Sequence, residues 1–368
     1  MIDLAVNLLW CVPNDVGGSE QYLVRQLVGL SELEHDYRVR VYAPTGFVRA
    51  HPALDSAFEV VEAPIDGRDR ARRVLAEHTW LARRTRSAGL VHHGGGTVPA
   101  LGGRPVVLTI HDLQWLTYPG YVRPVKLRYL RRQLPRSIHR SSVVTVPSSY
   151  VRSTVVDAYD IDPDRVVVVR HGIEPDLGAE RTPEDRLRAW YGLGDGPVLV
   201  LPAVTHPHKR HDFVLDLLVG PWADADVRVV FIGGTGHAEG AVAARLADPR
   251  LRGRVVRPGR VSTADRDGLI AMADALVFPS EYEGFGAPVL EAMALGTPVI
   301  ASDRTALPEV VGDAGLCLPL DLDAWAGALD EMHARRSELV AAGLARVPAF
   351  TAARSAGDLL NAYRLARS

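Results

Sequence analysis

Short runs of β-branched and apolar residues alternate along the chain with longer segments in which apolar residues recur every three or four positions. This alternation is typical of βαβ units, in which parallel strands form a sheet and helices cover its faces. The pattern predicts a first series of strands at 4–10, 38–43, 58–61, 90–92, 106–110, 142–147 and 166–170. It predicts a second series at 198–201, 227–232, 254–256, 275–278, 298–301 and 315–318. We therefore expect an α/β protein with two doubly wound, Rossmann-like sheets.

The length of 368 residues gives room for two domains at roughly 100–200 residues each. Between the two series of strands, the interval 172–196 contains the turn-forming residues Pro175, Gly178, Pro183, Gly192 and Gly194. We predict an N-terminal domain over residues 1–174, a C-terminal domain over 175–349, and a helix at about 350–368. Ligands favour clefts between domains and the carboxyl ends of parallel strands, so the informative residues should directly follow the strands.

Composition excludes several classes of protein. With 47% hydrophobic and 23% charged residues the chain has a globular composition, and no apolar stretch reaches the roughly 20 residues that span a bilayer. Cys11 and Cys317 lie far apart, which argues against a disulfide framework and against clustered zinc or iron–sulfur ligands. The first residues lack the basic region of a signal peptide, so we expect a cytoplasmic location. The net charge of −2 argues against a nucleic-acid-binding protein.

The charge is unevenly distributed. Residues 1–170 hold 22 Lys+Arg and 17 Asp+Glu, whereas residues 171–368 hold 20 and 27. Most of the positive charge lies in the stretches 68–86 and 123–140. The simpler interpretation is a set of solvated helix faces. The alternative is a binding surface for an anionic membrane or a phosphorylated acceptor, with a peripheral contact between the basic N-terminal domain and the inner face of the membrane.

The strongest local signal follows the predicted strand at 275–278. A loop with Gly284 and Gly286 leads into a short helix, for which Pro288 suits the first position and Gly296 suits the left-handed position after the last turn. The amides of Gly286 and Ala287 then point out of the helix N-terminus, beyond the sheet. Such a terminus binds anions, and phosphate is the expected one.

Two carboxylates, Glu283 and Glu291, flank this predicted phosphate site eight positions apart, with Glu291 expected in the first turn of the helix. A phosphate repels carboxylates, so both should face neutral hydroxyl pairs, which sugars supply. The simpler alternative is that the two residues only stabilise the helix N-terminus through its dipole, by about 0.3–1 kcal/mol.

This segment, Glu283-Gly284-Phe285-Gly286 followed by Glu291, resembles the E-x7-E motif of the family 4 nucleotide-sugar glycosyltransferases, which have the GT-B fold and retain anomeric configuration. The resemblance implies two Rossmann-like domains facing each other across a cleft, with the last helix crossing back onto the first domain. It implies that Glu291 binds the ribose of the donor, that Glu283 contacts the transferred hexose, and that the Gly286 and Ala287 amides hold the diphosphate. Phe285 belongs to the same donor-binding segment.

Further segments resemble the family in the same order along the chain. Gly17-Gly18 follows the first strand and opens a helix with Leu23, Leu27 and Leu30 at core spacing, like the glycine loop that meets the donor phosphate. His111 follows the strand at 106–110, where the family has a histidine near the transferred sugar. Val261 lies in the segment whose backbone meets the nucleobase. Taken alone, a double glycine before a helix is commonly a turn, and a histidine at a strand end is commonly structural.

Lys209 follows the first strand of the second domain and is one of only two lysines, the other being Lys126. Its ammonium suits a diphosphate. The family usually adds an arginine either just before this lysine or six positions upstream, where this chain has His208 and Ala203. The departure leaves the second cation open, with Arg210, His208 and His206 as the candidates.

These residues predict a hexosyltransferase that uses a nucleoside-diphosphate sugar and no tightly bound metal or cofactor. Four Asp-x-Asp pairs, at 162–164, 224–226, 265–267 and 321–323, lack the context of a metal site. The acceptor is expected to be a small molecule, a saccharide or a lipid-linked molecule. The alternatives are a nucleotide-sugar epimerase of the same fold and a non-catalytic nucleotide-sugar-binding protein.

Overall fold

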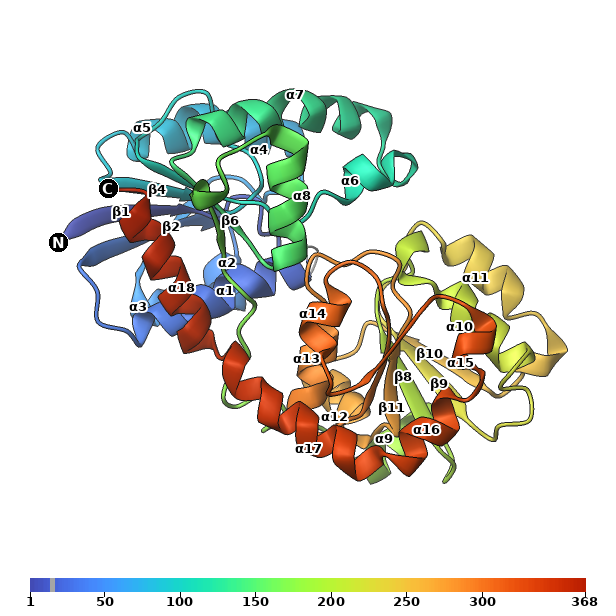
Figure 1. The fold of residues 1–368 in the computed structure, drawn as a ribbon. Helices are drawn as coiled ribbons and strands as arrows, with labels where there is room; N and C mark the ends of the chain where they lie inside the picture. The colour runs from blue at the N-terminus through green and yellow to red at the C-terminus, as the bar shows by residue number, and fades with distance from the viewer. Residues whose placement is uncertain (14–16) are drawn as a thin grey trace. The chain divides into compact units, whose positions relative to one another are not determined.

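The computed structural model describes residues 1–13 and 17–368, and the chain divides into two compact units (Figure 1). Unit 1 comprises Met1–Gly172 together with Phe350–Ser368, and unit 2 comprises Ile173–Ala349. The predicted boundary between residues 174 and 175 lies close to this division. Because 350–368 returns to unit 1, unit 2 is inserted into unit 1 along the sequence.

Unit 1 is built on a parallel sheet with strand order β3-β2-β1-β4-β5-β6-β7 among the described residues. Its strands are β1 Ile2–Asn7, β2 Tyr37–Pro44, β3 Glu59–Ala63, β4 Leu90–His93, β5 Val106–Thr109, β6 Val143–Val146 and β7 Val166–Val168. Its α-helices are α1 Gly18–Ser31, α2 Phe47–Ala50, α3 Pro52–Ala57, α4 Arg70–Ala76, α5 Ala82–Arg84, α6 Gln114–Thr117, α7 Pro124–Arg140, α8 Ser149–Tyr159 and α18 Ala352–Leu365.

The core of unit 1 joins the two ends of its sequence. Leu23, Leu27 and Leu30 of α1 are buried, as their spacing predicts, and they belong to one apolar cluster with Leu359 and Tyr363 of α18. The two helices pack directly against each other (Figure 1). Helix α18 is therefore part of the hydrophobic core of unit 1.

Unit 2 has a parallel sheet with strand order β10-β9-β8-β11-β12-β13 among the described residues. Its strands are β8 Val198–Pro202, β9 Arg228–Ile232, β10 Val255–Gly259, β11 Ala275–Phe278, β12 Val299–Ser302 and β13 Leu316–Leu318. Its α-helices are α9 Glu184–Tyr191, α10 His211–Val219, α11 Glu239–Arg245, α12 Thr263–Met272, α13 Ala287–Ala294, α14 Leu307–Val311, α15 Leu322–Ala326, α16 Ala328–Ala334 and α17 Arg336–Arg346. Each strand of both sheets matches a predicted strand.

One of the two largest differences from the predicted strands is at the end of β1, which stops at Asn7 although the apolar run continues to Trp10. The Asn7 side-chain oxygen accepts a hydrogen bond from the Leu9 amide at 3.1 Å, and the Cys11 amide bonds back to the Leu8 carbonyl at 2.9 Å. These local bonds turn the chain out of the strand.

The strand orders locate the ligand edge of each unit. Successive βα connections run outward in opposite directions from β1 and β4 in unit 1, and from β8 and β11 in unit 2. In doubly wound sheets, a crevice opens beyond the carboxyl ends of the strands at this switch point. Functional residues are therefore expected directly after β1 and β4, and directly after β8 and β11.

Candidate active site

The switch point of unit 2 brings together two charged side chains that are 74 residues apart. Lys209 follows β8, Glu283 follows β11, and the Lys209 Nζ lies 2.5 Å from the Glu283 Oε1. The side chains are only 18% and 11% exposed, respectively, so solvent screens the ion pair less than it screens surface pairs. The pair holds an ammonium and a carboxylate at the carboxyl edge of the sheet.

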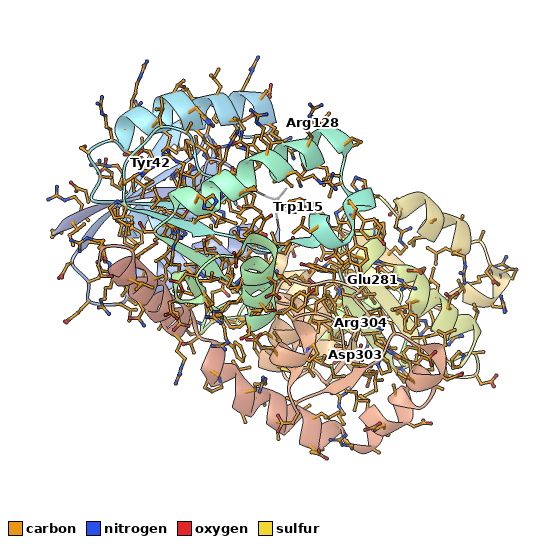
Figure 2. The ribbon with its side chains drawn as sticks, turned by 45° about the horizontal axis from the view of Figure 1, so that its top comes forward. Tyr42, Trp115, Arg128, Glu281, Asp303 and Arg304 are labelled. Atoms are coloured by element: carbon orange, nitrogen blue, oxygen red, sulfur yellow. The ribbon has the colours of Figure 1, made fainter. Side chains whose placement is uncertain are left out.

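Backbone contacts between neighbouring loops fix the Lys209–Glu283 pair. The Glu281 amide donates to the His208 carbonyl at 2.7 Å, which ties the loop after β11 to the loop after β8. Figure 2 labels Glu281 together with Asp303 and Arg304, which follow the adjacent strand β12. The Lys209 Nζ also lies 5.4 Å from the centroid of the Phe278 ring, so its ammonium faces an aromatic surface as well as a carboxylate.

Thr305 supports Glu283 from the loop after β12. Its Oγ1 accepts a hydrogen bond from the Glu283 amide at 2.9 Å. Its φ is +56°, a left-handed conformation that is unusual for a β-branched residue and is a form of backbone strain found at functional sites. The sequence analysis missed Thr305, because neither its hydroxyl contact nor its backbone conformation has a signal in the local sequence.

The loop after β11 leads into α13 much as its prolines and glycines predict. Gly286 is the residue before the helix with φ +100°, and a Cβ on it would lie 2.6 Å from the Leu307 Cδ2, so glycine is required there. Gly296 is left-handed with φ +76°, which confirms its predicted position after the helix. The helix begins at Ala287, so Pro288 is its second residue. Pro288 has no N–H and the Val289 amide donates to the Gly286 carbonyl at 3.0 Å, which leaves the Ala287 amide as the donor at the start of the helix.

Glu291 and Phe285 are both more deeply placed than Glu283. Glu291 is 7% exposed and is the fifth residue of α13, so it lies one position beyond the first turn in which it was predicted. The difference arises because the helix starts at Ala287, one residue earlier than Pro288. Phe285 is 3% exposed and anchors the loop before the helix.

A cavity of about 340 Å³ lies beside the loops that follow β8, β9 and β10. Phe231, Gly233, Gly259 and Arg260 are among the residues that line it. The predicted Val261 comes directly after this lining and is half-buried. The cavity is therefore at the carboxyl edge of the same sheet as Lys209.

A hydrogen-bond network that the sequence analysis did not identify connects the loops around this cavity. The Thr205 hydroxyl donates to the Glu239 Oε2 at 2.8 Å and accepts from the Gly236 amide at 2.7 Å. Arg257 Nη2 lies 2.6 Å from the Glu239 Oε1. These bonds join the loops after β8 and β9 to β10, and they depend on contacts between residues far apart in the sequence.

The histidines beside Lys209 are not cations in this structure. Burial, followed by the charge of Lys209, lowers the pKa of His208 to about 3, and burial also lowers the pKa of His206. Both imidazoles are therefore neutral at pH 7. Arg210 keeps its charge, and its Nη2 lies 3.1 Å from the Asp212 Oδ2. Of the three candidates for the second cation, only Arg210 carries a charge here.

The remaining predicted site residues lie in unit 1. Gly17 has φ +76° and precedes α1, and both Gly17 and Gly18 are exposed. His111 follows β5, and its Nε2 lies 2.8 Å from the Gly94 carbonyl oxygen. The centroid of its ring lies 5.3 Å from that of Trp10 and 5.6 Å from that of Tyr22. Because a carbonyl only accepts, the Nε2 carries the proton. Burial lowers the His111 pKa, so the ring is neutral and its Nδ1 holds a lone pair.

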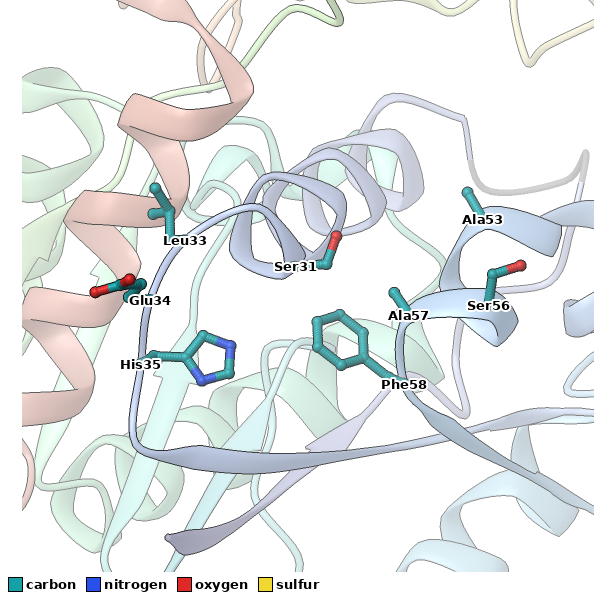
Figure 3. A pocket seen from close by; sticks show the side chains of 8 residues that line it. All are labelled: Ser31, Leu33, Glu34, His35, Ala53, Ser56, Ala57 and Phe58. Atoms are coloured by element: carbon teal, nitrogen blue, oxygen red, sulfur yellow. The ribbon is translucent and has the colours of Figure 1, made fainter.

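The larger hollow in Figure 3, of about 580 Å³, also lies in unit 1. It is lined by residues that include His35, shortly before β2, and Phe58, directly before β3. It is thus at the amino ends of these strands, on the opposite edge of the sheet from His111. Ligands of doubly wound sheets bind at the carboxyl ends, so its volume does not make it the candidate site.

Within residues 1–13 and 17–368, no three His, Cys, Asp or Glu side chains come together as a group able to hold a metal ion. Across the same described residues, none of the helices has the length and apolar composition needed to cross a bilayer.

Comparison with known proteins identifies the family. Residues 16–177 match the model of "Glycosyltransferase Family 4", and residues 196–335 match the model of "Glycosyl transferases group 1". The chain is 30% identical to O-antigen chain mannosyltransferase B of Escherichia coli, over 70% of each chain. It is 27% identical to the GDP-mannose-dependent alpha-(1-6)-phosphatidylinositol monomannoside mannosyltransferase of Mycolicibacterium smegmatis, over 89% of each chain.

The fold is shared with solved glycosyltransferases. The crystal structure of HepE from Anabaena in complex with UDP and glucose superposes with a TM-score of 0.76 at 17% identity, covering 99% of this chain and 100% of that one. Identity at this level establishes the fold alone, which is the predicted GT-B fold with two parallel α/β units. With matches over both units and a relative at 30% identity, the chain belongs to glycosyltransferase family 4.

Proposed function

We propose that the protein transfers a hexose from a nucleoside-diphosphate sugar to an acceptor hydroxyl, with retention of anomeric configuration. The observation that carries this proposal is the Lys209–Glu283 pair at the switch point of unit 2, in which Glu283 lies in the loop that leads into α13 and Lys209 in the loop after β8. A sugar diphosphate offers both an anion for the ammonium and hydroxyls for the carboxylate. The pair keeps the two groups in place until the donor separates them.

In this proposal each group acts on one part of the donor. The Lys209 ammonium and the amides of Gly286 and Ala287 stabilise the charge that builds on the diphosphate as the glycosyl bond breaks. Glu283 accepts hydrogen bonds from hexose hydroxyls, and Glu291 accepts them from the ribose. The amides of Gly286 and Ala287 belong to the backbone at the start of α13, so they need little reorganisation during the reaction.

We propose that His111, Gly17 and Gly18 of unit 1 also contact the donor. The neutral His111 presents an Nδ1 lone pair to a hydroxyl of the transferred sugar, because its Nε2 proton is held by the Gly94 carbonyl. The Gly17–Gly18 backbone meets the donor phosphate. We also expect transfer to continue after dialysis against a chelator, because the proposed roles assign no step to a tightly bound metal.

Retention is best supported by attack from the face that the leaving group occupies, with the departing phosphate taking the acceptor's proton. Glu283 is the carboxylate proposed to contact the hexose, but its charge is paired with Lys209 at 2.5 Å. A carboxylate held this way suits hydrogen bonding to hydroxyls better than covalent attack on the anomeric carbon. NMR of the anomeric proton in the first product formed tests this mechanism. A product with inverted anomeric configuration would contradict it.

The donor base and sugar are a separate part of the proposal. One relative is named as GDP-mannose-dependent, and the solved structure of HepE contains UDP and glucose. We propose that the base lies in the cavity lined by Gly233, Gly259 and Arg260, next to Val261. A thermal-shift comparison of GDP-mannose with UDP-glucose tests this, since a donor at 100 times its Kd adds about 2.7 kcal/mol of stability.

The decisive experiment is transfer by Glu283→Ala and Lys209→Ala, with Glu184→Ala as the matched control. Glu184 also forms an ion pair, with Arg188 at 2.7 Å, but on the exposed surface of unit 2. We expect both site variants to lose transfer while remaining folded, and the control to keep it. Near-normal turnover in both site variants would refute the proposal. A donor epimerised without acceptor would instead identify an epimerase, and donor binding with no turnover would identify a binding protein.

A further inference from the structure

A histidine and a glutamate from separate segments of unit 1 form a buried contact at the start of α1. The His51 Nε2 lies 2.6 Å from the Glu20 Oε1, and the two side chains are only 10% and 4% exposed, respectively. Glu20 lies in the first turn of α1, and His51 lies between α2 and α3. Because a carboxylate only accepts hydrogen bonds, the His51 Nε2 carries a proton and donates the bond to Glu20.

The helices on either side of His51 fix its imidazole. The centroid of its ring lies 4.6 Å from that of Phe47, which is fully buried, and the His51 amide donates to the Phe47 carbonyl at 2.9 Å. The Leu54 amide donates to the His51 carbonyl at 3.1 Å, and α3 packs against α1 (Figure 1). The position of the imidazole is therefore set by α2 and α3 as well as by Glu20.

Glu20 occupies the position from which a glutamate can bond to the end of its own helix. Gly17 is the residue before α1, so Glu20 is the third residue of the helix. In a capping box, a glutamate at this position reaches back to the amide of the residue before the helix. In this structure the Glu20 Oε1 is bonded to His51 instead. A carboxylate held by His51 does not compete in this way for the Gly17 amide.

The start of α1 offers backbone donors in open space. The Glu20 and Gln21 amides both donate to the Gly17 carbonyl, at 3.0 and 3.2 Å, which leaves the amides of Gly17, Gly18 and Ser19 as the donors at the start of the helix. A Cβ on Gly17 or Gly18 would lie more than 4 Å from every described heavy atom beyond its chain neighbours. The helix dipole attracts an anion to these amides, but a carboxylate in the same turn repels it. Where the Glu20 carboxylate is held therefore decides how well the helix start accepts an anion.

We propose that His51 is a positioning residue, which holds the Glu20 carboxylate aside so that the Gly17–Gly18 backbone can take a phosphate of the donor. This inference rests on the proposed function, in which that backbone meets the donor phosphate. A hydrogen bond to a carboxylate is stronger than one between neutral groups, so the N–H of His51 is a suitable restraint. His51 acts through Glu20 and needs no contact with the donor.

The first experiment measures binding of GDP-mannose and UDP-glucose to the full-length protein by titration calorimetry. His51→Leu removes the N–H but keeps an apolar side chain against Phe47, whereas His51→Gln keeps an N–H donor. We expect the donor Kd to rise about tenfold or more in His51→Leu and to stay within about twofold of the wild type in His51→Gln. The matched control is His35→Leu, which removes an imidazole that accepts from the Tyr37 amide at 3.3 Å, at the opposite edge of the sheet, and which should leave the Kd unchanged. Equal donor affinity in His51→Leu and the wild type would overturn the proposal.

Removing Glu20 distinguishes positioning from a purely structural role. If the released carboxylate weakens donor binding, Glu20→Ala/His51→Leu should bind the donor about as tightly as Glu20→Ala alone, with both Kd values within about threefold of the wild type. A double variant that binds no better than His51→Leu would show that the pair only stabilises the fold, and the inference would be wrong. Thermal midpoints check that each variant is folded, and His51→Phe, which keeps a ring against Phe47, replaces His51→Leu if the leucine variant is unstable.

A third measurement needs no donor and separates this inference from the proposed function. Once released from His51, Glu20 should bond to the Gly17 amide, so hydrogen–deuterium exchange at the start of α1 should slow in His51→Leu but not in His51→Gln. Unchanged exchange in His51→Leu would overturn the inference. If the wild type uses no nucleotide sugar, the proposed function fails, and slower exchange in His51→Leu would still support His51 as the residue that positions Glu20.

Discussion

Replacing Thr305 separates the support of Glu283 from the stability of unit 2. The Thr305 Oγ1 accepts from the Glu283 amide at 2.9 Å, while its own backbone has φ +56°. Thr305→Val keeps the volume and the branched side chain but removes the acceptor. An amide left unpaired in a partly buried site costs about 1–3 kcal/mol. We expect a loss of stability in that range, and transfer reduced by about tenfold or more as Glu283 loses its position.

Two companion variants distinguish the hydrogen bond from the backbone strain. Thr305→Ser keeps the hydroxyl and removes the branch, so its activity should remain close to that of the wild type. Thr305→Gly loses the hydrogen bond but relieves a left-handed conformation that costs on the order of 1–3 kcal/mol. The two effects on stability then nearly cancel. The glycine variant should therefore be about as stable as the wild type but as inactive as the valine variant.

The assay combines initial rates of transfer with hydrogen–deuterium exchange of the peptide that contains Glu283. Exchange reports the amide directly, so Thr305→Val should exchange faster there and Thr305→Ser should not. Valine and serine variants with equal rates and equal exchange would show that the hydroxyl does not support Glu283. The reasoning from the 2.9 Å contact would then be wrong.

Three further predictions concern the same edge of unit 2. Lys209 and Glu283 are mostly buried, and their charged atoms lie 2.5 Å apart. Lys209→Met or Glu283→Gln alone should therefore lower the free energy of unfolding by about 1–3 kcal/mol in denaturant melts, and the double variant should lower it by less than the sum. Strictly additive losses would argue against the pair. Gly286→Ala places a Cβ 2.6 Å from the Leu307 Cδ2 on a residue whose φ is +100°. We expect this variant to lose about 1–3 kcal/mol of folding stability and to have a lower thermal midpoint. An unchanged midpoint would contradict this geometry. The pKa of His208 is about 3 in the folded protein, so as the pH falls the unfolded chain binds the proton before the folded protein does. The free energy of unfolding should therefore fall as the pH drops from about 6.5 towards 3, by up to about 1.4 kcal/mol per pH unit. His208→Gln should reduce this slope when unfolding is measured as a function of pH.

Much of the fold was predictable because burial dictates periodicity. The strands of both units alternate with helices in the predicted order, and Leu23, Leu27 and Leu30 face the core as their spacing indicates. The end of β1 was predicted too late, because the Asn7 side chain turns an apolar run that would otherwise continue the strand. Local side-chain bonds of this kind override the hydrophobic pattern.

The site was predictable where function constrains the local sequence. The sequence predicted the site from the glycines around α13 and from the positions of Lys209 and Glu283 after strand ends. In the structure the Lys209 Nζ and the Glu283 Oε1 lie 2.5 Å apart. Thr305 was not predictable, because its contact with the Glu283 amide joins loops that follow two different strands. The neutrality of His208 also follows from burial, which the residues beside it do not reveal.

The position of α18 in unit 1 has a consequence for how the protein is made. A ribosome completes all of unit 2 before it produces Ala352–Leu365, although Leu359 and Tyr363 are needed to fill the core around α1. During synthesis the second unit can thus finish folding first, while the first unit waits with an uncovered apolar surface. Chaperone binding to nascent chains should therefore persist until α18 has emerged, and it should target the unit that was synthesised earliest.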